Sequence, residues 1–249
     1  MLLAIDIGNS NIKCGIFTNG KLVNRSAYKN FSSFVSFLKK NKQCEYAICS
    51  VAPPRLRKVK KVLRSISSFE PFIITKDVKF NLKIEYKSTG TLGMDRICSA
   101  EGAFNLQKEK VFNANRCIIT IDFGTATTIN LIEYPNVFAG GVIAPGIKTM
   151  FKSLHSNTAQ LPEVNLDDYK FLIGDDTVSS IASGVVNSTV GMIERTIEQL
   201  YKNEKCNEVI IYLTGGLAEK IQPFLSGNIF LDNSLVLKGI DAVYELNRD

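Results

Sequence analysis

The feature of this chain that most restricts its fold is a pattern that occurs twice. Residues 2–17 read LLAIDIGNSNIKCGIF, and residues 117–132 read CIITIDFGTATTINLI. In each copy an apolar run leads into Asp-x-Gly, then into small polar residues, and then into alternating apolar positions. This order predicts a buried strand, a tight turn and a second strand, which together form a β-hairpin. Because Asp6 and Asp122 are 116 residues apart in a chain of 249, we expect a duplicated domain.

The rest of the chain alternates between strand and helix patterns. Buried strands are predicted over 46–51, 72–74 and 209–213. Apolar residues at helical spacing predict helices over 53–66, 97–106 and 179–202, and a further helix is expected to begin near Leu217. Alternation of this kind indicates an α/β fold. We expect two domains, residues 1–114 and residues 115–249.

Composition excludes several classes of protein. With 45% hydrophobic and 22% charged residues, the chain is neither disordered nor a coiled coil. No apolar run approaches the roughly 18 residues that cross a bilayer, and Asp6 interrupts any signal-peptide core, so we expect no membrane contact. The six cysteines form no C-x-x-C and His155 is the only histidine, which excludes zinc fingers and gives little support to a histidine-dependent nucleophile. Reduced thiols, packed as small core residues in a cytoplasmic protein, are the expectation.

Basic residues concentrate in one segment, 55–64, within a chain of net charge +6. The same segment carries an apolar stripe, so we interpret its charges as the solvated face of a helix. A nucleic-acid site is the less favoured alternative, and we expect no nucleic-acid partner. The isolated His155 is interpreted as a surface residue.

The two turns carry residues that suit phosphate binding. Glycine lets backbone amides approach an anion, and the neighbouring Asn, Ser and Thr side chains add donors. An acid beside such a turn, as at Asp6, can hold a hydrated metal ion bound to phosphates. A plain hairpin turn is the alternative for either copy alone, but two copies that each follow an aspartate favour phosphate binding. Thr214-Gly215-Gly216, after a predicted strand, leaves backbone accessible to a flat ligand such as adenine.

A third group of residues suits proton transfer. Phosphoryl transfer to an alcohol depends on positioning, charge neutralisation and a carboxylate that accepts the hydroxyl proton. Asp95, which follows the flexible Gly93 and precedes Arg96, is a candidate base beside an anion contact. Without further information, a surface Asp-Arg pair near the start of a helix is the favoured alternative.

These segments resemble known motifs. DIGNSN, DFGTATT and the late TGG are similar to the phosphate 1, phosphate 2 and adenosine motifs of the actin-like kinase superfamily. More narrowly, the chain resembles type III pantothenate kinases almost end to end, and the G-x-D-R and DFGTATT pair is the most specific match. Further matching segments lie at 50–54, 140–146, 158–162 and 237–239. The resemblance implies two tandem ribonuclease H-like domains of the actin-like ATPase fold, with ATP in a cleft between them.

The resemblance also implies roles for individual residues. Its ATP-binding positions are Asp6, Ile7, Gly8, Asn9, Ser10, Asn11, Ile12, Lys13 and Thr125. Its pantothenate-binding positions are Tyr86, Gly93, Met94, Asp95, Arg96 and Thr177. Asp95 matches the catalytic base, and Asp122 matches the ligand of an activating monovalent cation, K⁺ or NH₄⁺. Where the family often has Asn-Pro after the tyrosine, this chain has Ser88-Thr89, which predicts a looser loop.

The activity implied is ATP-dependent phosphorylation of pantothenate to 4'-phosphopantothenate, the first step toward coenzyme A, with ATP as its Mg²⁺ complex. Family members are dimers with composite pantothenate sites, so we expect a homodimer in which Thr177 reaches the site of the other subunit. Two alternatives are another actin-like kinase, for sugars or acetate, and a non-catalytic regulator on the same fold. The G-x-D-R segment argues against the first, and the joint presence of Asp6, Asp95, Asp122 and Thr125 argues against the second.

Overall fold

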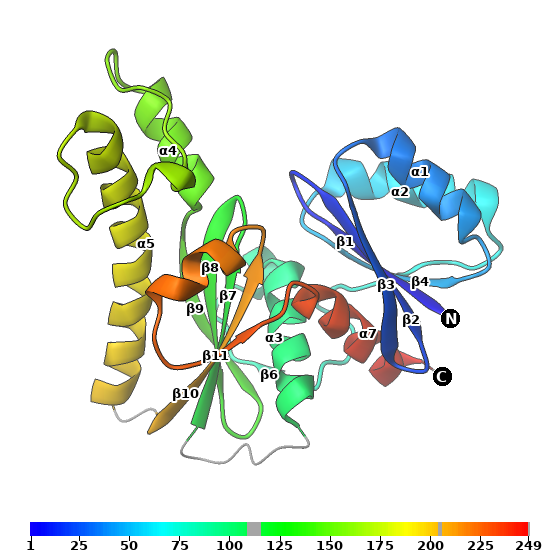
Figure 1. Cartoon of the computed structure of the whole chain (residues 1–249). Coiled ribbons are helices and arrows are strands. Elements are labelled where there is room, and N and C mark those ends of the chain that lie inside the picture. Colours follow the sequence, from blue (N-terminus) through cyan, green and yellow to red (C-terminus); the bar gives the residue numbers. More distant parts are fainter. Residues whose placement is uncertain (109–115, 204–205, 249) are drawn as a thin grey trace. The chain divides into compact units, whose positions relative to one another are not determined.

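The computed structural model describes residues 1–108, 116–203 and 206–248, and it shows an α/β protein (Figure 1). Contacts divide the described chain into two compact units. Unit 1 contains residues 1–108, 135–140 and 234–248; unit 2 contains residues 116–134, 141–203 and 206–233. Each unit is described by itself below.

The sheet of unit 1 is built around a completely buried strand. Its strands, in the order β3-β2-β1-β4-β5, are β3 (Lys21–Tyr28), β2 (Ile12–Thr18), β1 (Leu2–Ile7), β4 (Glu45–Ser50) and β5 (Phe72–Ile73). The central β1 pairs antiparallel with β2 and parallel with β4. All six residues of β1 are buried, which explains its nearly continuous apolar sequence. The predicted hairpin over residues 2–17 is confirmed.

Helices cover this sheet. They are α1 (Phe31–Lys40), α2 (Pro53–Ile66), α3 (Met94–Gln107) and α7 (Leu235–Asn247). Prolines open α2 in its first turn, where a missing N–H costs nothing. Val59 and Leu63 of α2 pack into the same core cluster as Ile5 of β1, while most of the helix's basic side chains face outward. The interpretation of this segment as a helix with a solvated basic face is therefore confirmed.

Small residues let α3 and α7 pack with their backbones in direct contact. A Cβ atom on Gly102 would lie 2.2 Å from the carbonyl oxygen of Leu235, and one on Gly239 would lie 1.7 Å from that of Cys98. This close packing explains why α7 groups with unit 1 although it comes last in the chain. Unit 1 thus differs from the predicted domain of residues 1–114 by including residues 135–140 and 234–248, and the predicted boundary at 114 lies outside the described residues.

Within unit 1, a short strand pairs with the first residues of β9 (Val137–Pro145). This strand, β6 (Lys83–Ile84), runs parallel to β9, with Lys83 opposite Val137 and Ile84 opposite Phe138. The 3₁₀ turn η1 (Thr89–Thr91) follows it and leads into α3.

Unit 2 contains the second hairpin, which forms part of a separate sheet. The strand order is β11-β10-β7-β8-β9, formed by β11 (Asn228–Leu231), β10 (Glu208–Gly215), β7 (Arg116–Phe123), β8 (Ala126–Glu133) and β9. The second predicted hairpin is confirmed, because β7 and β8 pair antiparallel. The helices are α4 (Ile147–Ser156), α5 (Thr177–Lys202) and α6 (Ala218–Ile221), with 3₁₀ turns η2 (Leu166–Asp168) and η3 (Gln222–Phe224). α4 and α5 contribute Phe151, Ala182 and Ile193 to the same core cluster as Ile119 and Leu213.

Two expectations about single residue types hold. All six cysteines are buried free thiols, as expected for small core residues. His155 is exposed on α4, where its Nδ1 lies 2.9 Å from the carbonyl oxygen of Leu161. Within the described ranges, no helix combines the length and apolar character needed to cross a bilayer.

Candidate active site

The first loop is the β1–β2 turn of unit 1. It is closed by a hydrogen bond from Gly8 N to the carbonyl oxygen of Asn11, at 3.0 Å. Asp6 lies at the end of β1, nearly buried, and its Oδ2 is 3.9 Å from Lys13 Nζ on the opposing strand. The side chains of Ile7 and Ile12 are in the core, so only their backbone can contribute to ligand binding.

A side chain from α2 braces this loop. Arg55 Nη1 donates a 2.7 Å hydrogen bond to the carbonyl oxygen of Gly8. Ser50, the last residue of β4, and Val51, which follows it, make further contacts with the end of β1, including Val51 N to Ile7 O at 3.2 Å. Sequence reasoning treated Arg55 as one of several solvated charges and missed this contact. The only signal in the sequence is that Arg55 stands first in the basic run, nearest to the strand that it follows.

The start of α3 presents Asp95. Gly93 is the N-cap and Met94 the first helical residue, so Asp95 lies in the first turn, where the helix dipole stabilises its negative charge. Asp95 Oδ1 accepts a 2.8 Å hydrogen bond from Arg96 N. A Cβ atom on residue 93 would lie 2.5 Å from that same oxygen, so a glycine is needed for the carboxylate to adopt this position.

Arg96 is buried against two aromatic rings. Its Cζ lies 5.6 Å from the ring centre of Tyr86 and 5.8 Å from that of Phe138. The two rings meet edge to face, with their centres 6.2 Å apart. Such contacts stabilise a guanidinium away from bulk water. The structure thus brings together Tyr86 and Arg96, two residues that the sequence analysis assigned to one substrate.

Asp6 and Asp95 lie near the same pair of buried thiols. A hydrogen bond with Cys98, together with burial, holds the pKa of Cys49 well above its usual value, and both carboxylates add to the effect. Burial raises the pKa of Cys98, again with contributions from the two aspartates. The first loop and the start of α3 therefore share one electrostatic environment within unit 1. Raised pKa values make both thiols unreactive.

The second loop is the β7–β8 turn of unit 2, and backbone contacts hold it in place. Gly124 N donates to Ala126 O at 3.1 Å, and Gly146 N donates to Thr125 O at 3.0 Å. Thr149 Oγ1, from α4, donates to the same Thr125 oxygen at 2.7 Å. A Cβ atom on Gly146 would lie 2.3 Å from the carbonyl oxygen of Gly124, so the loop packs directly on backbone.

The Gly-Gly motif at the end of β10 packs beside the acid of this loop. In the parallel register, Thr214 is opposite Asp122 and Gly215 is opposite Phe123. Gly215 has φ +97°, in the left-handed region, and a Cβ atom there would lie 2.4 Å from Asp122 Oδ1. Unit 2 therefore brings the DFGTATT segment and the Thr214-Gly215-Gly216 segment side by side.

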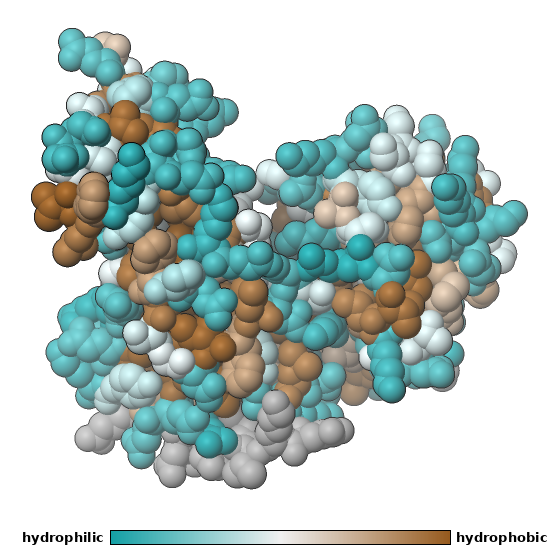
Figure 2. Space-filling model, viewed as in Figure 1, coloured by the Kyte–Doolittle hydropathy of each residue, from teal (hydrophilic) through white to brown (hydrophobic). Residues whose placement is uncertain are grey.

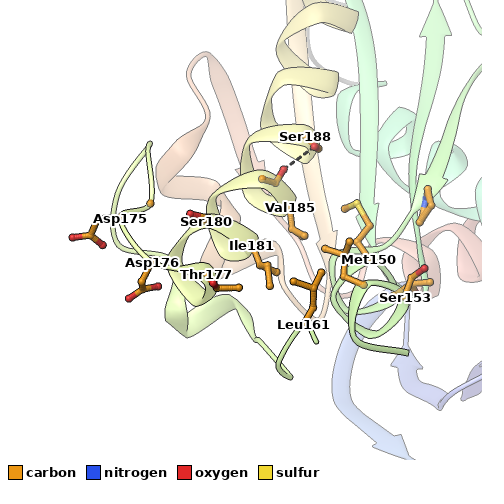
Figure 3. A pocket seen from close by; sticks show the side chains of 15 residues that line it. Met150, Ser153, Leu161, Asp175, Asp176, Thr177, Ser180, Ile181, Val185 and Ser188 are labelled. Atoms are coloured by element: carbon orange, nitrogen blue, oxygen red, sulfur yellow. Dashed lines mark hydrogen bonds between the residues drawn. The ribbon is translucent and has the colours of Figure 1, made fainter. Parts of the chain in front are cut away.

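Thr177 opens α5 and lines a cavity of about 950 Å³ between α4 and α5. Figure 3 shows apolar side chains facing one another across this cavity, among them Met150, Leu161 and Ile181. The carboxylates of Asp175 and Asp176 point away from it. Asp176 is the N-cap of α5, and hydrogen bonds from Ser179 hold its pKa below the usual value. Thr149, which contacts the second loop, is also in the cavity wall.

The residues present fit a magnesium–nucleotide complex and a monovalent cation. In protein sites Mg²⁺ is often held by one or two carboxylates together with substrate phosphates, and Asp6 supplies a carboxylate beside the first loop. Asn11 Oδ1 is buried there without a hydrogen-bond partner among the described residues, which leaves an acceptor for metal-bound water. Because Gly215 has no side chain, the Asp122 carboxylate can lie against the end of β10, and a carboxylate is an oxygen ligand suited to a hard cation. Across the described residues, no cluster of three or more His, Cys, Asp or Glu forms a metal site without such phosphates.

Comparison with known proteins decides the family. A model of the type III pantothenate kinase family matches residues 2–199. The chain belongs to the type III pantothenate kinase family. A type III pantothenate kinase from Sulfurihydrogenibium sp. is 32% identical, covering 96% of this chain and 98% of the relative. One from Finegoldia magna is 31% identical, covering 100% of this chain and 98% of the relative.

Solved structures show the same fold at lower identity. A conserved Baf family protein from Campylobacter jejuni has a TM-score of 0.58 and 21% identity, with 98% of both chains covered. A glucokinase from an Antarctic psychrotroph has a TM-score of 0.53 and 11% identity, again over 98% of both chains. The predicted actin-like α/β fold is confirmed, and the type III pantothenate kinase family implies pantothenate and ATP as substrates, with a divalent metal.

Proposed function

We propose that the protein transfers the γ-phosphoryl group of ATP to the primary hydroxyl of pantothenate, giving 4'-phosphopantothenate and ADP, the first step toward coenzyme A. Family membership supports the choice of acceptor. The observation that carries the proposal is the juxtaposition in unit 1 of Arg96 with Tyr86, directly beside the Asp95 carboxylate.

On the acceptor side, Arg96 would bind the carboxylate of pantothenate. Its guanidinium is nearly buried between aromatic rings, where a charge-assisted bond to a carboxylate is stronger than in water. Tyr86 and the backbone of Gly93 and Met94 would complete the contacts. The acceptor hydroxyl would then lie within reach of Asp95.

The chemical step needs little from the protein beyond position and charge. The hydroxyl oxygen forms a bond to the γ-phosphorus, the bond from that phosphorus to the β–γ bridging oxygen breaks, and ADP leaves with the electron pair. The hydroxyl proton passes to Asp95, which acts as general base. The position of Asp95 in the first turn of α3 places its negative charge at the positive end of the helix dipole.

On the nucleotide side, the proposal assigns roles to both loops. In unit 1, the Gly8, Asn9, Ser10 and Asn11 turn would donate to phosphate oxygens, with Lys13 adding positive charge and Asp6 holding the metal. In unit 2, Thr125 would contact the phosphates. Mg²⁺, when bound, supplies positive charge to the phosphoryl oxygens. Asp122 would bind K⁺ or NH₄⁺, which adds further positive charge near the phosphates.

An ADP-release assay with pantothenate, acetate and several sugars tests the proposal. Among these acceptors, we expect turnover only with pantothenate. Asp95→Asn should lower kcat by about 10²–10⁴-fold, the usual range for a lost general base, while ATP still binds. Asp77→Asn, at an exposed acid of the same unit, is the matched control and should leave kcat unchanged. Near-normal turnover by Asp95→Asn would remove Asp95 from the mechanism, and turnover with a sugar would favour the alternative kinase.

We also propose that the active unit is a homodimer with composite pantothenate sites. Support comes from apolar surface on unit 2: Phe171, Leu172 and Ile173 are 58%, 66% and 81% exposed, beside the open α4–α5 cavity. Asn187 Nδ2 donates to Leu172 O at 3.2 Å, which fixes the backbone of this segment to α5. Figure 2 shows apolar atoms on the side that carries α4 and α5. Exposed apolar surface of this kind marks an interface.

Complementation tests this second proposal. Asp95→Asn and Thr177→Trp should each be inactive alone. In a mixed dimer, one site collects both lesions and the other stays intact, so subunit exchange should restore up to about half of the activity per heterodimer. No recovery, with exchange confirmed by mass measurement, would mean that each site is built within one chain.

A further inference from the structure

α3 contains a buried acid that the proposed mechanism does not use. Glu101 is 0% exposed and stands among the small residues Ala100, Gly102 and Ala103. Burying a carboxylate is unfavourable unless both of its oxygens are hydrogen-bonded. The bonds that Glu101 makes therefore indicate what it holds in place.

Both oxygens of Glu101 bind one short segment of unit 1. Oε1 accepts a 2.8 Å hydrogen bond from Leu82 N, and Oε2 accepts a 3.0 Å hydrogen bond from Asn81 Nδ2. The same segment is held from its other side by Asn136, whose Nδ2 donates to Asn81 O at 2.6 Å. The carbonyl oxygen of Asn136 in turn accepts from Lys83 N at 2.8 Å.

This segment leads directly to the aromatic residue of the substrate site. Residues 83 and 84 form β6 against β9, and Glu85 N donates to Phe138 O at 3.0 Å. Tyr86 comes next, with its ring against Phe138 and Arg96. The chain from Asn81 to Tyr86 thus has one anchor on α3 and one on β9.

We propose that Glu101 is a positioning residue of the substrate site: through Asn81 and Leu82 it fixes the β6 segment, so that Tyr86 meets Arg96. Arg96 and Glu101 are five residues apart on α3, a rise of roughly 7.5 Å at 1.5 Å per residue. One rigid helix therefore carries the guanidinium and also sets the position of the ring beside it. This inference rests on the proposed function, since Tyr86 and Arg96 are taken to bind pantothenate.

Glu101→Gln separates this role from a purely structural one. The glutamine amide keeps one acceptor oxygen, but its NH₂ group takes the place of the other oxygen and faces a hydrogen-bond donor. One of the two hydrogen bonds to the segment at Asn81 and Leu82 is therefore lost, while the size of the side chain is kept. We expect the KM for pantothenate to rise about 10-fold, with kcat and the KM for ATP within about 3-fold of wild type. Asn81→Ala removes the donor of one of the two hydrogen bonds to Glu101 and should give a smaller rise in the KM for pantothenate.

A matched control lowers stability elsewhere in unit 1. Val59→Ala makes a cavity in the core below α2 and should lower the thermal midpoint without changing the KM for pantothenate. Hydrogen exchange supplies a readout that needs no turnover: Glu101→Gln should speed exchange over residues 82–86 but not over β1 or β4.

The two measurements distinguish the possible failures. Unchanged exchange over 82–86 in folded Glu101→Gln would overturn the positioning role, as would an equal rise in KM for Val59→Ala. Faster exchange in this segment, with a wild-type protein that does not turn over pantothenate, would uphold the positioning role and overturn the proposed function.

Discussion

The two Asp-x-Gly loops share a sequence pattern but are held in different ways. In unit 1, a charged side chain from a neighbouring helix, Arg55, binds the carbonyl oxygen of Gly8. In unit 2, the side chain of Thr149 also donates to the carbonyl oxygen of Thr125, but the main support is backbone packed on backbone: Gly146 lies against Gly124 and Thr125 with no room for a Cβ atom. The first loop is thus braced by a charged side chain, whereas the second has, besides its side-chain bond, a support that belongs to the main chain itself.

The difference indicates where each loop can tolerate change. A hydrogen bond from a long, half-exposed side chain adds about 1 kcal/mol and can be lost without unfolding. A Cβ atom added at Gly146 would lie closer than van der Waals distance to the second loop, so it could be accommodated only by moving one of the two segments. We therefore expect the first loop to be tunable by single substitutions, and the second to be nearly intolerant of them.

The largest effect is expected for Gly146→Ala. The new methyl group would lie 2.3 Å from Gly124 O and 2.7 Å from Thr125 O, so the second loop must shift. Turnover should fall at least about 100-fold, since misplacement by about 1 Å is enough for such a loss, and the thermal midpoint should drop. The control is Gly191→Ala in α5, where nothing lies within 4 Å of the added atom. Wild-type kinetics for Gly146→Ala would show that the two loops do not differ in this way.

Asp122→Ala tests the acid of the second loop. Losing one charged ligand should weaken ATP binding in K⁺ buffer by about 10–100-fold, the equivalent of about 1.5–3 kcal/mol. Wild type should need K⁺ or NH₄⁺ and work poorly in Na⁺, whereas the variant should respond little to the choice of cation. The measurement is ATP affinity and turnover in matched chloride salts. Equal wild-type activity in sodium and potassium would contradict the assignment.

A smaller effect is expected for Arg55→Met, which keeps the apolar stem but removes the bond to Gly8 O. The KM for ATP should rise about 3–10-fold, because the first loop loses its brace, while stability changes by about 1 kcal/mol or less. Arg57→Met, two residues along on the exposed side of α2, should change neither quantity. Identical ATP constants for the two variants would mean that the brace does not influence the loop.

The smallest effect on turnover is expected at a residue that influences stability alone, Asp241 in unit 1. Burial, assisted by Glu245 one helical turn away, raises the pKa of Asp241 in α7 to about 6. A raised carboxylate pKa means that the folded state holds its proton longer, so this residue's contribution falls as pH rises from about 4 to 6 and then stays constant. Asp241→Asn should therefore stabilise the protein by about 1–3 kcal/mol at pH 7.5 and by little at pH 4. Denaturant unfolding at both pH values measures this, and a gain at pH 4 alone would refute it.

The fold follows from features that act locally along the chain. Both hairpins were predictable because their strands have the apolar pattern of buried strands and Asp-x-Gly leads into each turn. The hydrophobic pattern and the turn residues therefore predict the same structure. The helix at 53–66 was predictable from Pro53 and its apolar stripe. The grouping of α7 with unit 1 was not, because it depends on contact between Gly102 and Leu235, which are 133 residues apart.

The site residues that belong to sequence motifs were predictable, whereas those that act through tertiary contacts were not. Asp6, Asp95 and Asp122 stand out because each follows or precedes glycine in a recognisable segment. In the sequence, Arg55 cannot be distinguished from the solvated basic residues that follow it. Its hydrogen bond to Gly8 is seen only in the structure, where α2 lies beside the first loop. Glu101 leaves a faint signal, an acid within a run of small and apolar residues, but its partners Asn81 and Leu82 become visible only when the helix is packed.

The close contact between α3 and α7 also bears on how the protein is made. Residues 234–248 complete a unit whose first strand is residues 2–7, so the ribosome must produce all the residues between them before that unit can close. At roughly 5–20 residues per second, α3 waits on the order of 10 s for its partner helix to emerge. During that interval the glycine face of α3 is uncovered, and nascent chains arrested before residue 234 should be cleaved by protease within α3, whereas released chains that contain residues 234–248 should resist.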